Sequence, residues 1–513
     1  MPSSHRAIWS RRRRNNASSI RGNLSKTDRA GISQNEENMS PSETSPLRLP
    51  QFIDDRRVSL FQYVVVGLCA FVMFMDGFDT QAISYAAPHI AKEWGLSKQE
   101  LGVIFSSALA GLMVGYLVLS PLSERFGHKR LITVSSIAFG LCTLTTVWSQ
   151  DLTQLMALRF ITGIGLGAAA PSAVALTAEF SPKRLRASFV LVIYCGFSFG
   201  FIVAGMASDW LIPALGWRSL FWVGALAPMV LVPVLLRWLP ESPVFMIQHS
   251  ADPQRIYRVL RKIDRKLPPQ ERPVFTVEQA DLGTSGKGEE GGEQARLRTL
   301  FTRNQVLGTL LIWSVFMINL GEFYALQSWL PSIMTSLHYP MHIVVTATTL
   351  TAVGGIAAAL VSGPAMDRLG AYGTLATVYL LGFVFVAVTG LAFNAPLWVL
   401  LGANFLAGCC ISGGQKSLIA FAAIFYPAQI RSTGVGWALG IGRVGGIIGP
   451  LVVGAALGLN WSASAVFYAM AVPMLVAGLI MLVLGRRYGR TASAPARETQ
   501  DAPAGRVSSP ETA

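Results

Sequence analysis

The chain alternates between long apolar stretches and short polar segments. From Phe61 onward, stretches of roughly 20 apolar residues recur, which is the length that a helix needs to cross a bilayer. Six of them precede a long charged segment and six follow it. We place these spans near 61–86, 100–121, 130–149, 154–178, 187–210 and 218–238, and near 304–330, 342–366, 372–394, 396–424, 432–458 and 462–485.

This pattern predicts an all-α integral membrane protein with twelve transmembrane helices in two six-helix bundles. The polar ends lack an apolar period, so we expect disordered tails there. In the central loop, the basic run from Arg255 to Lys266 predicts a surface helix, followed by a flexible Gly/Glu-rich linker. The predicted parts are an N-terminal tail (1–57), an N-terminal bundle (58–238), a central loop (239–303), a C-terminal bundle (304–486) and a C-terminal tail (487–513).

Composition agrees with a membrane protein. Of 513 residues, 52% are hydrophobic and 14% are charged, whereas soluble proteins carry about 25% charged residues. The net charge of +14 is spread over short segments between spans, which indicates the positive-inside pattern rather than nucleic-acid binding. The basic segments are both tails, the turns 122–130 and 179–187 and the central loop. We therefore expect both termini and the central loop to be cytoplasmic.

The sequence shows no pattern for metal binding, disulfide bonds, ATP binding or catalysis. The five cysteines lie in apolar spans without the spacing of metal ligands or a disulfide framework. There is no phosphate-binding Walker loop and no cluster of catalytic residues, so we expect neither ATP-driven transport nor an enzyme. We expect no cofactor and no metal.

Two carboxylates stand inside the first span, at Asp76 and Asp79. An aspartate at the centre of a membrane helix costs roughly 2.5–3.5 kcal/mol, so the pair indicates a function. Asp76 lies roughly 22 Å from the inner end of its span, and Arg159 of the fourth span lies roughly 8 Å from the outer side. In a core about 30 Å thick these depths coincide, so an ion pair is within reach.

Asp76 and Asp79 are three residues apart and share a helix face. Two close carboxylates in a medium of low dielectric constant do not both remain ionised at low cost, so we expect one of them to carry the coupling proton. Which of the two does so is open. The alternative is a static ion pair that only fixes helix packing.

Further charged residues lie inside the second set of spans. Arg443 stands near the middle of the eleventh span among glycines, and its guanidinium can bind a carboxylate with two hydrogen bonds. We take Arg443 as the first candidate for binding an anionic substrate, and Arg159 as the second. Arg443 could instead pair with Glu322 of the seventh span. Glu322 and Lys416 are also candidate substrate-binding residues.

An aromatic ring needs an apolar slot, and aromatic residues in the spans can supply one. Phe78 and Tyr85, next to the acidic pair, are our candidates for substrate contacts. The wider set of aromatic candidates is Phe74, Tyr194, Phe323, Tyr324, Trp329 and Trp437.

A turn motif repeats after the second and eighth spans. The first copy runs from Ser120 through Glu124, Arg125 and Gly127, and the second is Gly363-Pro-Ala-Met-Asp367-Arg368-Leu-Gly370. The pattern resembles that of the major facilitator superfamily, over residues 58–486. A carboxylate beside helix ends and arginines can lock one conformation and release it in another. Simple capping of the loop is the alternative.

Other motifs resemble the aromatic acid:proton symporter family. They are Asp76-Gly-Phe-Asp79-Thr, Arg159-Phe-Ile-Thr-Gly163, Glu179-Phe-Ser-Pro182 with Arg184 and Arg186, Pro240-Glu-Ser-Pro243, Arg431-Ser-Thr-Gly434 and Gly440-Ile-Gly442-Arg443. The resemblance implies a secondary transporter of the bacterial inner membrane that imports an aromatic carboxylate, such as a benzoate or hydroxybenzoate, by proton symport. The predicted conformational-gating residues are Glu124, Arg125, Gly127, Asp367, Arg368, Gly370, Glu179, Arg186 and Arg431.

Alternatives remain at this point. The chain could take up sugars or other organic anions, or export drugs, and a membrane sensor without transport is a further possibility. We expect a monomer whose partners are an aromatic carboxylate, protons and the lipid bilayer.

Overall fold

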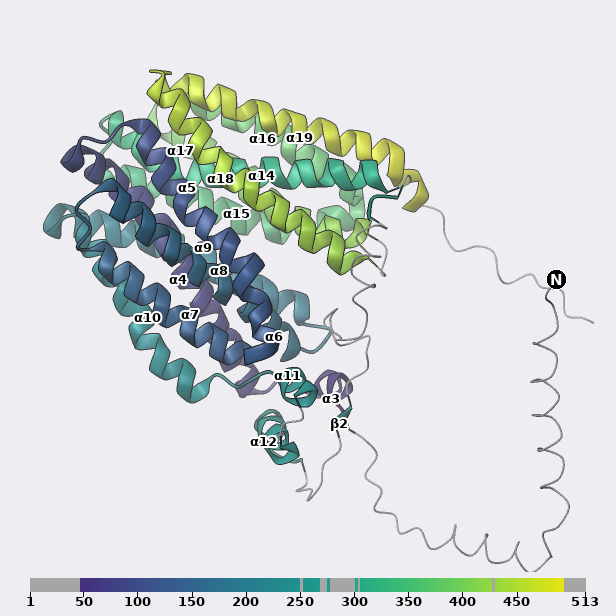
Figure 1. The fold of residues 1–513 in the computed structure, drawn as a ribbon. Coiled ribbons are helices and arrows are strands. Elements are labelled where there is room, and N and C mark those ends of the chain that lie inside the picture. Colours follow the sequence, from purple (N-terminus) through teal and green to yellow (C-terminus); the bar gives the residue numbers. More distant parts are fainter. Residues whose placement is uncertain are drawn as a thin grey trace, which may run out of the picture.

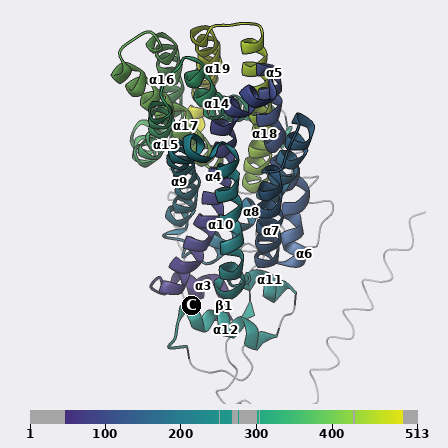
Figure 2. The same ribbon diagram turned by 90° about the vertical axis from the view of Figure 1, so that its left-hand side faces the viewer.

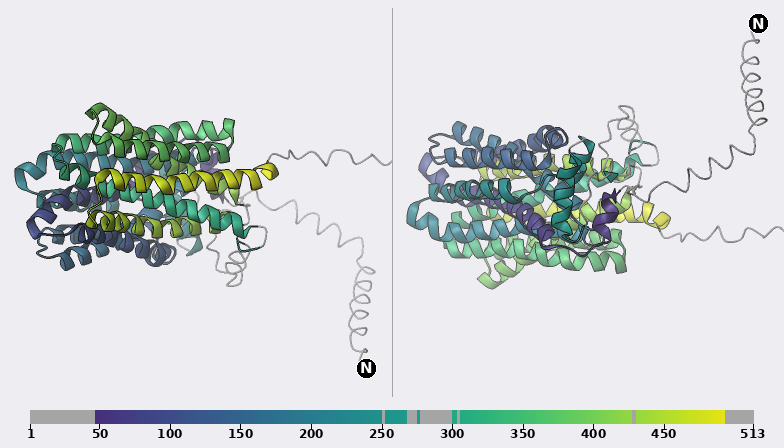
Figure 3. Two further views of the ribbon diagram at one scale, coloured as in Figure 1. Left: turned by 90° about the horizontal axis from the view of Figure 1, so that it is seen from above. Right: turned by 90° about the horizontal axis from the view of Figure 1, so that it is seen from below.

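The computed structural model describes residues 47–249, 252–267, 275–276, 300–302, 305–426 and 430–492. Within them, twelve long helices form two bundles that lie side by side, and Figures 1 and 3 show these helices running in roughly the same direction. This confirms the predicted twelve-helix fold. The basic run 11–14, most of both predicted tails and the Gly/Glu-rich linker lie outside the described residues.

The first bundle contains α4 (Leu60–Trp94), α5 (Lys98–Val114), α7 (His128–Thr146), α8 (Leu152–Glu179), α9 (Arg186–Leu215) and α10 (Arg218–Trp238). Three short turns extend α5: η1 (Gly115–Leu119), η2 (Ser120–Leu122) and α6 (Ser123–Phe126). The second bundle contains α14 (Val306–Ser336), α15 (Met341–Leu369), α16 (Ala371–Ala392), α17 (Leu397–Phe425), α18 (Arg431–Gly458) and α19 (Ala463–Ala492).

Local sequence explains where the first helices begin. Ser59 caps α4 and Ser97 caps α5, each exchanging hydrogen bonds with a Gln or Glu three residues later. These capping boxes satisfy amide groups that would otherwise lack partners. Gly95 ends α4 with φ +67°, a conformation that favours glycine.

Among the described residues, eleven helices are long and apolar enough to cross a bilayer, by length and composition. The twelfth, α7, is more polar because hydroxyl residues line its inner side. Thr143 and Thr146 are buried against the neighbouring helices. The polar face of α7 therefore belongs to the bundle interior and not to lipid.

The two bundles repeat one packing scheme. In the first bundle α4 packs on α9, α5 on α8 and α7 on α10; in the second, α14 packs on α18, α15 on α17 and α16 on α19. Between bundles, α5 meets α18, α9 meets α15 and α4 meets α14. α4 and α14 are the first helices of their bundles. The other two contacts each join the second helix of one bundle to the fifth helix of the other, as expected of a duplicated fold.

Short elements gather at one end of the molecule, which we call the tail side (Figure 2). They are β1 (Leu47–Arg48), α3 (Leu49–Asp54), α11 (Pro243–Gln248), α12 (Pro253–Ile263) and β2 (Phe275–Thr276), with β1 and β2 paired in parallel. The helix α12 confirms the predicted surface helix. We call the opposite end the far side.

One boundary needs correction. The predicted disordered tail, residues 1–57, includes α3, which is folded, with Leu49, Phe52 and Ile53 buried. These apolar side chains pack in one cluster with Tyr257 and Leu260 of α12. A short helix of this kind is stabilised by tertiary packing, which a local sequence pattern does not report.

Contacts between the bundles concentrate on the far side. Ser106 of α5 donates a hydrogen bond to the carbonyl of Ile447 of α18 at 2.7 Å. Phe105 packs edge-on against Trp329 of α14, whose indole donates to the carbonyl of Pro450 at 2.9 Å. On the tail-side half of α18, a Cβ at Gly436 or Gly440 would meet no atom within 4 Å. The bundles are thus packed together on the far side and apart along this part of α18.

Candidate functional site

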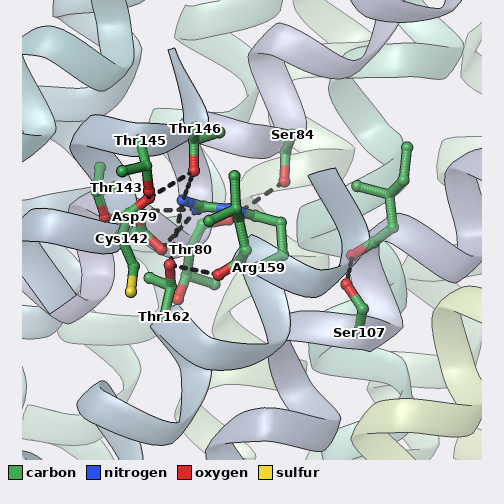
Figure 4. Close-up of polar contacts among 12 residues, drawn as sticks. Asp79, Thr80, Ser84, Ser107, Cys142, Thr143, Thr145, Thr146, Arg159 and Thr162 are labelled. Atoms are coloured by element: carbon green, nitrogen blue, oxygen red, sulfur yellow. Dashed lines mark hydrogen bonds and ion pairs between the residues drawn. The ribbon is translucent and has the colours of Figure 1, made fainter. Parts of the chain in front are cut away.

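Asp79 and Arg159 form a buried ion pair between α4 and α8 (Figure 4). The Nη1 of Arg159 donates to both carboxylate oxygens of Asp79, at 2.9 and 3.0 Å. Both side chains are buried, with Arg159 fully enclosed. An Asp–Arg pair between the first and fourth spans is therefore present, but its acid is Asp79 and not Asp76, for which the depths were compared.

Threonines surround this pair. Thr143 donates to Asp79 at 3.3 Å, and Nη2 of Arg159 donates to Thr146 at 3.1 Å and to Thr162 at 3.5 Å. The guanidinium also lies over the Phe221 ring, 5.1 Å from its centroid. Most hydrogen-bonding capacity of the pair is thus used inside the first bundle, although Nε of Arg159 has no partner among the described residues.

Asp76 lies one helical turn from Asp79 in a different environment. It is equally buried, but it forms no ion pair with any described residue and its Oδ1 has no hydrogen-bond partner there. Its carboxyl has a hydrogen bond with the Thr80 hydroxyl. Arg443 and Asp79 are the charged groups within electrostatic range. The two predicted acids therefore differ: Asp79 is paired and Asp76 is not.

Arg443 reaches from α18 into a group of tyrosines. Its Nη1 donates to the Tyr324 hydroxyl at 2.8 Å, and its guanidinium lies 4.6 Å from the centroid of the Tyr116 ring. Tyr194 and Asp76 complete the electrostatic surroundings. Three helices of two bundles thus supply aromatic hydroxyls around one cation, while much of the guanidinium's donor capacity has no protein partner in the described part of the chain.

A pocket lies next to these groups, between the bundles. Its enclosed volume is small, about 20 Å³, and the rest of the hollow is open. Asp79, Thr80, Tyr324 and Ser328 are its polar walls, and apolar side chains supply the rest. The apolar walls include Ile83, Phe105, Leu109, Leu112 and Leu166. An apolar slot with a few polar groups at one end is suited to a small amphipathic molecule.

The other predicted substrate-binding residues lie in different places. Phe78 packs against Phe74, and the Gly224 backbone of α10 leaves room for its ring inside the first bundle. Tyr85 forms a short hydrogen bond with Thr348 of α15 and so joins the bundles on the far side. The structure does not bring these two residues to the Arg443 group.

Glu322 and Lys416 are separate from one another and from Arg443. Glu322 is buried in α14, and its Oε2 has no partner among the described residues. No charged group lies within its electrostatic range. The alternative pairing of Arg443 with Glu322 is therefore not formed in this structure. Lys416 donates to the hydroxyl and carbonyl oxygens of Ser412, at 3.2 and 3.4 Å.

The two copies of the turn motif have unequal surroundings. Gly127 has φ +93° and lies against Glu241, so closely that a Cβ would stand 2.3 Å from Oε2. Glu241 also accepts a hydrogen bond from the Lys129 amide at 3.1 Å, while Glu179 is hydrogen-bonded to Ser242. The motif at residues 120–129 is thus joined to the Pro-Glu-Ser-Pro segment.

In the second copy, Asp367 and Arg368 are exposed, and neither has a hydrogen bond or ion pair within the described ranges. Gly370 repeats the positive φ at +83° but has open space around it. Arg125 and Arg186 are exposed, and Arg186 lies within electrostatic range of Glu179. The side chain of Arg431 lies outside the described residues.

Sequence reasoning missed Tyr116 and the threonines of α7. Tyr116 lies in the π-helical turn η1, where the backbone carries an extra residue per turn and re-aims the side chain. Thr143 and Thr146 are three residues apart on one face of a span. That spacing was a visible signal for a polar inner face.

Comparison with known proteins agrees with this architecture. A family model described as Major Facilitator Superfamily matches residues 69–376 and 312–510. The chain belongs to the major facilitator superfamily. The 4-hydroxybenzoate transporter PcaK of Acinetobacter baylyi is 35% identical over 443 residues, covering 86% of this chain and 95% of its own length. The gallate transporter of Pseudomonas putida is 33% identical over 459 residues, covering 89% and 99%.

These relatives confirm the resemblance to the aromatic acid transporters of the superfamily. They are named as transporters and not as enzymes, which agrees with the expectation for this chain. Among solved structures, a partially occluded inward-open form of the xylose transporter XylE from E. coli has a TM-score of 0.63 at 17% identity, covering 83% of this chain and 98% of its own. At that identity the likeness concerns the fold alone.

Proposed function

We propose that this major facilitator protein imports an aromatic carboxylate together with a proton. The relatives that carry 4-hydroxybenzoate and gallate suggest the substrate class. The observation that supports the mechanism is the unequal pairing of the two acids. Asp79 is held by Arg159, whereas Asp76 forms no ion pair with a described residue and lies near Arg443.

In this mechanism Arg443 binds the substrate carboxylate. Its guanidinium has further planar donors that no described residue occupies, and Tyr324 already fixes its orientation. The tyrosine rings and the apolar pocket walls offer surfaces for the aromatic ring.

Asp76 takes up the coupling proton. An ionised Asp76 and a bound carboxylate would repel one another near the same cation, so protonation of Asp76 favours substrate binding, and the reverse holds equally. Asp79 instead keeps Arg159 neutralised. Coupling thus arises because the two ligands share one cation.

Alternation between two states then opens the same site first to one side of the membrane and then to the other. The far-side contacts of α5 with α18 would open in the other state, while the motif around Gly127 and Glu241 would rearrange on the tail side. The distribution of lysine and arginine favours a cytoplasmic tail side, and the bacterial relatives suggest an inner membrane.

The test is uptake of labelled 4-hydroxybenzoate into vesicles that contain the purified protein. With one proton per monovalent anion, a gradient of one pH unit sustains about a tenfold accumulation. We expect Arg443→Gln to abolish this accumulation while the protein remains folded. Excess benzoate should compete and excess xylose should not. Accumulation that ignores the pH gradient, or competition by xylose alone, would contradict the proposal.

A further inference from the structure

The pocket between the bundles has a small enclosed part to which the proposed mechanism gives no role. Its volume is about 20 Å³, which is enough for one water molecule or one hydroxyl group and too small for an aromatic ring. Polar residues line the pocket from both bundles: Asp79 and Thr80 of α4 from the first, Tyr324 and Ser328 of α14 from the second. A space of this size and polarity fits a small group that forms hydrogen bonds.

Ser328 differs from the other polar residues of the pocket. Asp79, Thr80 and Tyr324 each have a hydrogen-bond partner. Ser328 is only 7% exposed, yet its hydroxyl forms no hydrogen bond with another described residue. Further along the same helix, Thr335 donates to the carbonyl four residues before it, at 2.8 Å, which is a common arrangement for a hydroxyl in a helix. A buried hydroxyl that does not bond to its own helix is available to a ligand.

The pocket lies beside the cation that would bind the substrate carboxylate. Tyr324 and Ser328 are four residues apart on α14, so they share one face of the helix and lie about 6 Å apart along its axis. The Tyr324 hydroxyl accepts a hydrogen bond from Arg443 at 2.8 Å. A ring whose carboxylate is bound by Arg443 can therefore direct its other end towards Ser328.

Hydrogen-bonding capacity decides which end of the substrate suits the enclosed space. A carboxylate only accepts hydrogen bonds, so it has none to donate to the carboxylate of Asp79. A hydroxyl group both donates and accepts, so it can donate to Asp79 and accept from Ser328. The carboxylate of the substrate thus belongs at Arg443 and a ring hydroxyl in the enclosed part of the pocket.

We propose that Ser328 determines specificity by forming a hydrogen bond with a hydroxyl group on the ring of the substrate, so that the site selects hydroxylated aromatic acids over unsubstituted ones. The ring would lie in the open part of the pocket, between apolar walls. An unsubstituted ring leaves Ser328 without this partner, which lowers affinity. The inference rests on the proposed function, since it assumes that Arg443 binds the carboxylate.

The experiment compares binding of benzoate with that of the three monohydroxybenzoates to the purified full-length chain, by calorimetry near neutral pH. The methylbenzoate with the same substitution as the best hydroxybenzoate is included, because a methyl group fills similar space and forms no hydrogen bond. The variant is Ser328→Ala. Ser332→Ala is the matched control: Ser332 lies one turn further along α14, is also buried, has a hydroxyl without a partner among the described residues and is not part of the pocket.

We expect one hydroxybenzoate to bind the unmodified protein at least about tenfold more tightly than benzoate, and its methyl analogue to bind no more tightly than benzoate. Ser328→Ala should lower the affinity for that hydroxybenzoate about threefold to tenfold and change the affinity for benzoate by less than about twofold. Ser332→Ala should leave both affinities as they are. The isomer that binds best reports how the pocket and Arg443 are placed relative to one another.

Two results would overturn the inference. One is an unmodified protein that binds benzoate or the methylbenzoate as tightly as every hydroxybenzoate. The other is a Ser328→Ala variant that changes the affinities for benzoate and hydroxybenzoate by the same factor, or changes neither. In both cases benzoate still binds to the unmodified protein, so the proposed function stands. If no aromatic acid binds, the proposed function fails together with the inference.

Discussion

Asp76 and Asp79 offer a comparison within one helix. They are the same residue type, one turn apart and equally buried. Asp79 accepts hydrogen bonds from Arg159 and Thr143 inside the first bundle. Asp76 lies within electrostatic range of a cation of the other bundle, and one of its oxygens has no hydrogen-bond partner among the described residues.

The structure thus distinguishes the roles of Asp76 and Asp79, which the sequence alone treats as one acidic pair. A carboxylate whose partners lie in its own rigid bundle keeps those partners when the bundles move. A carboxylate whose nearest cation belongs to the other bundle changes surroundings with each conformational step. Asp79 therefore suits a structural ion pair, and Asp76 suits exchange of a proton. The following predictions test this division, beginning with the largest effect.

Removing Arg159 should damage the protein most. Arg159→Met leaves the Asp79 charge buried without a cation, at a cost of about 3–5 kcal/mol. We expect little folded protein, or a strongly lowered melting temperature in detergent, measured by thermal unfolding. The control is the double variant Asp79→Asn with Arg159→Gln, in which no charge is left alone and much of the stability should return. Equal losses in the single and double variants would argue against a structural pair.

Asp76→Asn should leave the fold intact and abolish coupling. The amide replaces a carboxyl that has no cation fixed to it, so the melting temperature should change little. Accumulation driven by a pH gradient should disappear, while exchange of labelled for unlabelled substrate continues, because exchange needs no net proton movement. Vesicle uptake and counterflow measure the two separately. Continued gradient-driven accumulation would remove Asp76 from the proton role.

Tyr324→Phe should have an intermediate effect on substrate affinity. The tyrosine hydroxyl orients Arg443 through one hydrogen bond. A hydrogen bond to a charged group contributes about 1.5–3 kcal/mol, and only part of this bears on how Arg443 meets the substrate. We expect a dissociation constant about threefold to tenfold higher for benzoate, with coupling retained. Tyr379→Phe is a matched control, since that hydroxyl has no partner among the described residues. Equal effects of the two substitutions would show that Tyr324 does not position Arg443.

The sequence predicts the fold well because each span is an independent signal. Apolar length marks a membrane helix without knowledge of its neighbours, and the repeated motif near Asp367 indicates two bundles. The Asp79–Arg159 pair was also within reach, because residue counting gives depth along a span. Depth alone does not give rotation about the helix axis, so it could not separate Asp76 from Asp79.

The remaining features depend on tertiary packing. Tyr116 joins Arg443 only because η1 re-aims it and α18 crosses α5. Phe78 was a reasonable candidate from its neighbours in sequence, yet its ring lies against α10. The helix α3 has only a few apolar residues in a polar segment, and its burial requires α12.

The partly exposed ion pair between Arg56 and Asp264 is a reference for the buried Asp79–Arg159 pair. Its removal should have the smallest effect on stability. It joins the segment after α3 to the end of α12 at 2.6 Å, with the two side chains 33% and 24% exposed. The hydrogen bond from Arg56 lowers the pKa of Asp264. The ion pair therefore contributes to stability above the ordinary carboxyl pKa, and this contribution is lost as pH falls through the lowered pKa of Asp264.

Asp264→Asn should thus reduce stability by at most about 1 kcal/mol, because water screens a partly exposed pair. Thermal unfolding of this variant and of the unmodified chain should differ at neutral pH and converge in acid. High salt should shrink the difference as well. Arg159→Met should show no such rescue by salt, because its charge is out of reach of solvent ions. If Asp264→Asn lowered stability as much as Arg159→Met, burial would not determine how much these ion pairs contribute to stability.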